Sequence, residues 1–157
     1  MLVTMKEILD RAKKDNYGVT SIMVDRSSLS YEDNIAQTKE TVKMCRPLNI
    51  SVEAELGHVG QSEDYSSDGS DHFTKPEEVK KFVEETGIDC LAVAIGTAHG
   101  RYHGTPHIDF DLLKQITDVV DIPLVLHGGS GTGDENLRKA VKNGIQKVNL
   151  ATELVVA

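Results

Sequence analysis

Residues 90–100 read CLAVAIGTAHG and residues 123–131 read PLVLHGGSG, and these two stretches decide the fold. Each is a short apolar run that leads to a histidine followed by glycine. Such runs are typical of strands that are buried on both faces of a parallel sheet. Between them, Leu112, Leu113 and Ile116 recur at helical spacing, which predicts a crossover helix.

The same alternation of strand and helix signals continues outward from this pair. Short apolar or alternating runs predict strands at 20–25, 51–55, 90–95, 123–126 and 146–150. Strand–helix–strand repeats of this length form right-handed crossovers, so we predict an α/β fold with a parallel sheet. A chain of 157 residues has room for one domain, and residues 1–157 are expected to form it.

Capping-box pairs predict where several helices begin. A Ser or Thr caps the amide three residues later, and an acidic residue at that position reaches back. The pairs that fit this pattern are Thr4 with Glu7, Thr74 with Glu77, and Thr132 with Glu135, and Ser30 with Asp33 is its weaker variant.

Charge and composition exclude several classes of partner. With 17 basic and 25 acidic residues the net charge is −8, which repels nucleic acid and anionic membranes. No apolar run reaches the roughly 18 residues of a membrane span, and no signal-peptide pattern opens the chain. Two cysteines without CxxC spacing are expected to be reduced core residues. We therefore expect a cytoplasmic protein, whose ligand can still be a small phosphorylated molecule held by backbone amides.

Two histidines follow neighbouring predicted strands at the ends where ligands of parallel sheets gather. Because neighbouring strands lie about 4.8 Å apart, His99 and His127 can converge on one zinc ion. The alternative is a pair of hydrogen-bonded pocket residues without metal. Glu55 ends another predicted strand and is either a further metal ligand or a salt-bridge partner. Glu53 projects to the same side of that strand.

The Gly-Gly-Ser-Gly run after His127 favours an anion site. Consecutive glycines let the backbone approach a ligand and direct several N–H groups onto it. In (β/α)₈ barrels the phosphate site is often made by the last two strand–helix loops, which correspond to residues 128–131 and 149–152. A flexible turn is the alternative.

A long polar connection spans residues 57–74 and is rich in Gly, Ser and Asp. Loops of this length are usually lids or disordered segments. We predict a lid, because the connection leaves the carboxyl end of a strand, with a floppy surface loop as the alternative. Glu63 and Asp64 on it are candidate acid–base groups or simply solubilising charges.

Six runs stand in this order along the chain: MLVTMKEILDRAKKDNYGV (1–19), VEAELG (52–57), TGIDCLAVAIGTAHGRY (86–102), IDFDLL (108–113), PLVLHGGSG (123–131) and GIQKVNLATEL (144–154). Together they resemble class II, metal-dependent ketose-bisphosphate aldolases. The resemblance implies a zinc-dependent (β/α)₈ barrel that cleaves fructose or tagatose 1,6-bisphosphate to dihydroxyacetone phosphate and glyceraldehyde 3-phosphate. It covers nearly the whole chain.

The resemblance also assigns roles to individual residues. His99 and His127 fall on zinc ligands of the family. A carboxylate on the family's mobile loop assists proton transfer, and Glu63 falls nearest to it, although residues 60–64 read GQSED where the family usually has GGQED. The positions that bind the dihydroxyacetone phosphate end fall on Gly100, Gly128, Gly129, Ser130, Asn149, Ala151 and Thr152.

One motif of the family does not occur in this sequence. The family carries a third zinc histidine beside a catalytic aspartate in a Leu-Asp-His motif. A full barrel takes about 250 residues and eight strands. We therefore expect about five of the eight barrel units, an incomplete barrel with impaired aldolase activity.

Two other interpretations stay open. One is a non-catalytic sugar-phosphate-binding remnant of such an aldolase. The other is an open flavodoxin-like sheet, for which the sequence shows no flavin or nucleotide fingerprint. The open edges of a five-stranded sheet further predict association with a second copy, as a homo-oligomer.

Overall fold

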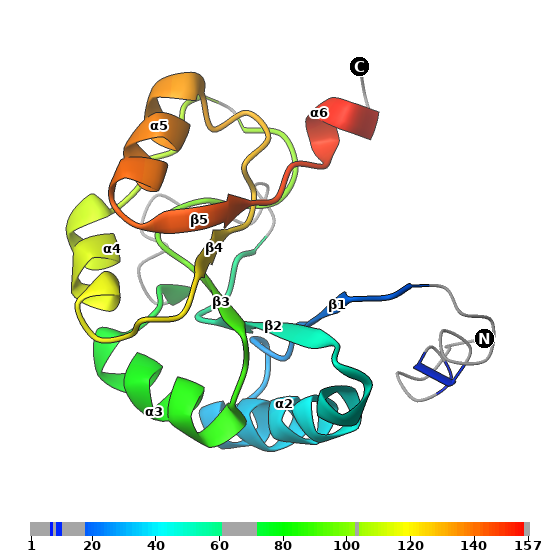
Figure 1. Ribbon diagram of the computed structural model, residues 1–157. Coiled ribbons are helices and arrows are strands. Elements are labelled where there is room, and N and C mark those ends of the chain that lie inside the picture. The colour runs from blue at the N-terminus through cyan, green and yellow to red at the C-terminus, as the bar shows by residue number, and fades with distance from the viewer. Residues whose placement is uncertain (1–6, 8, 11–17, 61–71, 103, 156–157) are drawn as a thin grey trace.

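A computed structural model describes residues 7, 9–10, 18–60, 72–102 and 104–155 (Figure 1). Its five strands form one parallel sheet in the order β1-β2-β3-β4-β5. All five predicted strands are present, and each observed end lies within two residues of its predicted position. The strands are β1 (Ser21–Val24), β2 (Ser51–Leu56), β3 (Cys90–Val93), β4 (Leu124–Leu126) and β5 (Ile145–Val148).

Helices cover the outer side of the sheet, and their apolar stripes form the core with it. Figure 1 shows them along the outside of a curved sheet that opens on the opposite side. Phe82, Leu91, Leu113 and Leu124 are fully buried between the two layers. The helices are α2 (Tyr31–Cys45), α3 (Pro76–Thr86), α4 (Phe110–Thr117) and α5 (Asp134–Lys142), with a 3-10 turn (Arg46–Leu48) after α2 and a short α6 (Thr152–Val155) after β5.

The inner face of the sheet carries charged side chains among apolar ones, and the sheet is strongly curved. Register places Glu53 beside Cys90 and Val125 beside Lys147, all on this face. Along a flat sheet β2 and β5 would be about 14 Å apart, because strands are spaced at about 4.8 Å. Glu53 and Lys147 nevertheless form an ion pair. The sheet must therefore curl inward, as the wall of a barrel does.

The predicted helix starts are partly correct. Ser30 caps α2, with its Oγ accepting the Asp33 N–H at 3.2 Å. The capping box predicted at Thr74 is wrong, since α3 begins after Lys75 without a side-chain cap. The Thr74 hydroxyl instead donates to the Leu56 carbonyl at 2.5 Å, a tertiary contact that competes with capping.

Two further observations bear on the predictions. Among the described helices, none combines the length and the apolar character needed to cross a membrane. The predicted lid is described only at its ends, residues 57–60 and 72–74. Thr4, Glu63 and Asp64 lie outside the described residues.

Candidate active site

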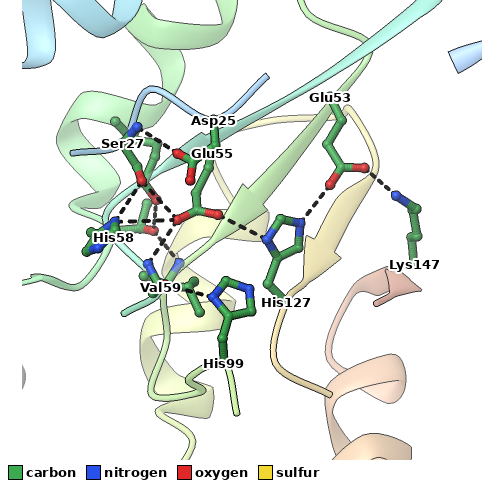
Figure 2. A network of polar contacts seen from close by, with 12 residues as sticks. Asp25, Ser27, Glu53, Glu55, His58, Val59, His99, His127 and Lys147 are labelled. Carbon is green, nitrogen blue, oxygen red and sulfur yellow. Dashed lines mark hydrogen bonds and ion pairs between the residues drawn. The ribbon is translucent and has the colours of Figure 1, made fainter. Parts of the chain in front are cut away.

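The carboxyl ends of two neighbouring strands bring His99 and His127 together, as the sequence predicted. His127 directly follows β4, and His99 lies on the loop after β3. Their ring centroids are 5.7 Å apart and their planes are inclined by 50° (Figure 2). The geometry that the interpretation required is therefore present.

The backbone of the segment after β2 fixes the orientation of His99. Its Nδ1 lies 3.0 Å from the Val59 carbonyl, and its backbone N–H donates to the Gly60 carbonyl at 2.9 Å. Because a carbonyl only accepts, Nδ1 carries the hydrogen. When the ring is neutral, Nε2 then has the lone pair that a metal needs.

Two glutamates of β2 hold the buried ring of His127 (Figure 2). Its Nε2 lies 2.8 Å from Glu53 Oε1, and its Nδ1 lies 3.0 Å from Glu55 Oε2. Burial by itself lowers the pKa of His127, but the hydrogen bonds and charges of both carboxylates outweigh it and raise the pKa to about 9. Without a metal ion, the ring is therefore protonated at neutral pH.

Glu53 is a buried, ionised carboxylate with partners on three strands. Besides His127, it accepts from the Lys147 ammonium group and, at 3.7 Å, from the Cys90 thiol. Burial acts to raise the pKa of Glu53, yet the hydrogen bonds from His127 and Lys147 lower it overall. Burial, with the charge of Glu53, raises the pKa of Cys90 to about 11, so this thiol stays protonated.

The two oxygens of Glu55 have different partners. Oε1 accepts from the Ser27 hydroxyl at 3.0 Å and from the Val59 N–H at 2.9 Å. Ser27 also lies 2.9 Å from His58 Nδ1. Oε2 is buried and pairs with His127 Nδ1 at 3.0 Å, in a geometry poorer than that of a regular hydrogen bond. In the metal-free chain, the charge on this oxygen is therefore balanced by the protonated His127 ring.

These side chains have the donor chemistry of a zinc site. Zinc takes imidazole nitrogen and carboxylate oxygen, and its histidine ligands usually donate their other N–H to a carboxylate or carbonyl. His99 and His127 both follow that pattern, through Val59 and Glu53. Within residues 18–60, 72–102 and 104–155, no three or more His, Cys, Asp or Glu side chains stand close enough to hold an ion as they are. The types of donor atom thus fit zinc, but the described side chains would have to move closer together to coordinate an ion.

A cavity of about 370 Å³ lies beside the two histidines. Six of the seven predicted phosphate-binding residues line it. The seventh, Gly129, instead packs against β5, where an added Cβ would lie 2.6 Å from Val148 Cγ1. The lining residues are Met23, His99, Gly100, His127, Gly128, Ser130, Asn149, Ala151 and Thr152.

Close backbone packing holds the two histidine loops together. Gly128 has a φ of +66°, and a Cβ there would lie 2.2 Å from the Ala98 carbonyl oxygen. The Tyr102 hydroxyl accepts the Ala98 N–H at 2.6 Å and lies 2.9 Å from the Gly128 carbonyl. Thr132 donates to that same carbonyl at 2.9 Å. The capping box predicted at Thr132 is therefore wrong, and α5 begins after Gly133 without a side-chain cap.

Ser130 joins the glycine loop to the loop after β5. Its Oγ accepts the N–H groups of Ala151 at 3.0 Å and Glu153 at 3.4 Å. The Gly131 N–H donates to Glu153 Oε1 at 2.7 Å. A second cavity of about 440 Å³ adjoins the first and shares Gly100, Ser130 and Thr152 with it. The two cavities together offer room for an extended ligand.

Comparison with known proteins decides the family. Residues 3–157 match the model of the family described as fructose-bisphosphate aldolase class-II. The chain belongs to this family. Its five strands are five of the eight units of the aldolase (β/α)₈ barrel, and the chain forms an incomplete barrel.

Solved structures of aldolases share this fold. The YdjI aldolase from Escherichia coli is 41% identical with a TM-score of 0.80, over 98% of this chain and 52% of that chain. A putative fructose-1,6-biphosphate aldolase from Coccidioides immitis is 39% identical with a TM-score of 0.77, over 91% and 52%. A fructose-bisphosphate aldolase from Campylobacter jejuni is 26% identical with a TM-score of 0.74, over 98% and 49%. The chain thus spans about half the length of these aldolases.

Proposed function

We propose that this class II aldolase chain carries out metal-dependent aldol cleavage and condensation of a ketose 1,6-bisphosphate, either fructose or tagatose bisphosphate. The products of cleavage are dihydroxyacetone phosphate and glyceraldehyde 3-phosphate. The observation that supports this is the convergence of His99 and His127 beside the glycine-lined cavity. Because the chain spans about half of its solved relatives, we propose that it turns over slowly by itself.

We propose zinc as the cofactor, held by His99, His127 and Glu55. When bound, zinc supplies a Lewis acid that polarises the ketone oxygen and stabilises the enediolate left after cleavage. The protein's own part is orientation. The Val59 carbonyl accepts the Nδ1–H of His99, and the Glu53 carboxylate accepts the Nε2–H of His127.

The glycine loop and the loop after β5 are the proposed site for the phosphate of dihydroxyacetone phosphate. Ser130 Oγ already accepts two backbone N–H groups, and its own hydrogen has no acceptor among the described residues. A phosphate oxygen in the cavity is an acceptor for that hydrogen. The backbone at Gly128 approaches the other loop closely because it has no side chain. The residues proposed for this role are Gly100, Gly128, Gly129, Ser130, Asn149, Ala151 and Thr152.

We propose Glu63 as the carboxylate that assists proton transfer. It follows Gly60 by three residues in the sequence, and the Gly60 carbonyl is bonded to the backbone of His99. The last described residue before this segment, Gly60, therefore lies beside His99. A positioned general acid or base contributes about 10²–10⁴-fold to rate.

The proposal is tested by a coupled assay for dihydroxyacetone phosphate, with both sugar bisphosphates and a zinc titration. We expect slow, zinc-dependent cleavage that His99→Ala abolishes, with His107→Ala as the exposed control. Zinc-independent turnover, or turnover that survives His99→Ala, would contradict the mechanism. Turnover at the rate of a full-length aldolase would contradict the proposed impairment.

A second candidate is a non-catalytic sugar-phosphate-binding module. The sequence lacks the Leu-Asp-His motif, and in the described part of the chain no three possible zinc ligands lie close enough to bind one ion. This candidate predicts binding of dihydroxyacetone phosphate without cleavage of either sugar. Calorimetry alongside the coupled assay separates the two functions.

We also propose that copies of the chain associate. In the described sheet, β1 and β5 lie at the two ends and each pairs with one neighbour. Unpaired strand edges favour pairing with another chain. Light scattering would give the mass in solution, and a monomer at assay concentration would refute association. The free thiols Cys45 and Cys90 suit the cytoplasmic setting that we propose.

A further inference from the structure

Lys147 reaches across the inner face of the sheet to a buried partner. It lies on β5, whereas Glu53 lies on β2, with β3 and β4 between them. The side chain of Glu53 is 1% exposed and that of Lys147 is 51% exposed. The solvent-exposed side chain of Lys147 is directed at the buried carboxylate of Glu53 (Figure 2).

Glu53 is held from two sides at once. Oε1 faces His127 Nε2 at 2.8 Å, and Oε2 faces the Lys147 ammonium group. A carboxylate with both oxygens bound cannot rotate without breaking a charge-assisted hydrogen bond. Its plane is therefore fixed relative to the His127 ring.

This arrangement determines which nitrogen of His127 is available. With Nε2–H donated to Glu53, the other nitrogen, Nδ1, is the one that faces Glu55. In His99 the Val59 carbonyl binds Nδ1 and leaves Nε2 available. No side-chain substitution removes that carbonyl. In His127 the available nitrogen depends on the side chains of Glu53 and Lys147, so its identity can be tested by substitution.

We propose that Glu53 and Lys147 form a positioning pair that holds His127 by its Nε2–H and leaves Nδ1 as the metal-binding nitrogen. This inference rests on the proposed zinc function. Neither residue touches the cavity that is proposed for the phosphate, so metal and phosphate binding should respond differently when the pair is broken. A purely structural role would lower stability and alter both kinds of binding together.

The test compares zinc affinity and inorganic phosphate affinity in the full chain. Glu53→Ala should weaken zinc binding about 10–100-fold, the usual effect of removing an outer-shell partner of a ligand. Glu53→Gln, which keeps an acceptor, should retain more zinc affinity than Glu53→Ala. Lys147→Met should weaken zinc binding severalfold, and Lys147→Arg should restore it. Phosphate affinity should stay within about twofold in all four variants.

Lys114→Met is the matched control, because this lysine pairs with Asp118 on the exposed surface of α4. Zinc affinity equal to wild type in Glu53→Ala would overturn the proposal. Equal losses of zinc and phosphate affinity would also overturn it, since they indicate a structural role.

A second readout separates failure of this inference from failure of the zinc function. Long-range ¹H–¹⁵N NMR on the metal-free chain at pH 10 reports which ring nitrogen of His127 carries the hydrogen. We expect Nε2–H in wild type and a mixture of tautomers in Glu53→Ala. If wild type binds no zinc but shows this difference, the positioning pair stands and the zinc function fails. If both proteins show the same tautomers, the positioning pair is refuted.

Discussion

The ring centroids of His99 and His127 are 5.7 Å apart. His99 Nδ1 is bonded to the Val59 carbonyl, whereas His127 has Nε2 on Glu53 and Nδ1 beside Glu55. Zinc–nitrogen bonds are about 2.0–2.1 Å long, so an ion fits between rings at this separation. The acceptors differ in kind. One is a backbone carbonyl, and the other is a buried carboxylate that is itself paired with a lysine.

This relationship predicts the effect of removing a single imidazole. His127→Ala should lower zinc affinity at least tenfold, because it removes a ligand. It also leaves Glu55 buried without its cationic partner and Glu53 with Lys147 alone. Competition with a chromophoric chelator measures the affinity. His107→Ala, on an exposed loop, should bind zinc as wild type does. Unchanged affinity in His127→Ala would remove this residue from the proposed ligand set.

The raised pKa of His127 predicts how stability depends on pH. In the unfolded chain an imidazole titrates near 6.5, and in the folded chain the pKa of His127 is about 9. The stabilisation is complete below about pH 6.5 and is lost as the pH rises through about 9, at most about 3 kcal/mol. Thermal unfolding of the chelator-treated protein should therefore shift to lower temperature between these values. His127→Gln should lack that slope.

The same protonation predicts the pH dependence of zinc binding. The ion competes with the proton on His127, so zinc affinity should rise between about pH 6.5 and 9. Isothermal titration in buffers of different ionisation enthalpy would count the protons released. Binding that is independent of pH across this range would show that the ion does not displace a proton from this ring.

Much of the fold could be predicted because strand–helix alternation is a local signal. Residues 90–95 and 123–126, which precede His99 and His127, are apolar throughout, and each run contains a buried strand. Helix starts were less predictable. Thr74 and Thr132 have capping-box spacing, but strand-end and loop carbonyls take their hydroxyls. Such tertiary contacts compete with local capping and leave no mark in the local sequence.

In the candidate site, too, local features could be predicted from the sequence and long-range contacts could not. Chain order placed the histidines together, since the carboxyl ends of neighbouring parallel strands meet at one edge. Alternation placed Glu53 and Glu55 on one side of a strand, but could not choose their partners. Lys147 is 94 residues away from Glu53 in the chain, and the contact depends on the curl of the sheet. Tyr102 was missed because it follows a loop without periodicity.

Tyr102 gives a prediction about the link between the two histidine loops. Tyr102→Phe removes the acceptor of the Ala98 N–H and the hydroxyl beside the Gly128 carbonyl. Leaving a buried polar group unpaired costs about 1–3 kcal/mol, and we expect a loss of this size in urea unfolding. Tyr31→Phe is the matched control, since that hydroxyl makes a single hydrogen bond, to the Glu78 carbonyl. Equal losses in both variants would mean that the Tyr102 hydroxyl has no special role in joining the loops.

Gly128 provides the sharpest test of the close approach between the two loops. Gly128→Ala places a Cβ 2.2 Å from the Ala98 carbonyl oxygen, so one loop must move, and we expect a loss of roughly 3 kcal/mol or more. Gly133 also has a positive φ, +86°, but a Cβ there meets nothing within 4 Å. Gly133→Ala therefore measures a backbone cost without a clash, about 1–3 kcal/mol for a side chain in a region that favours glycine. The difference between the two variants isolates the steric term, and displacement of the Gly128 loop should also weaken phosphate binding in Gly128→Ala only. Similar losses in both variants would show that the loops are not packed as closely as this geometry requires.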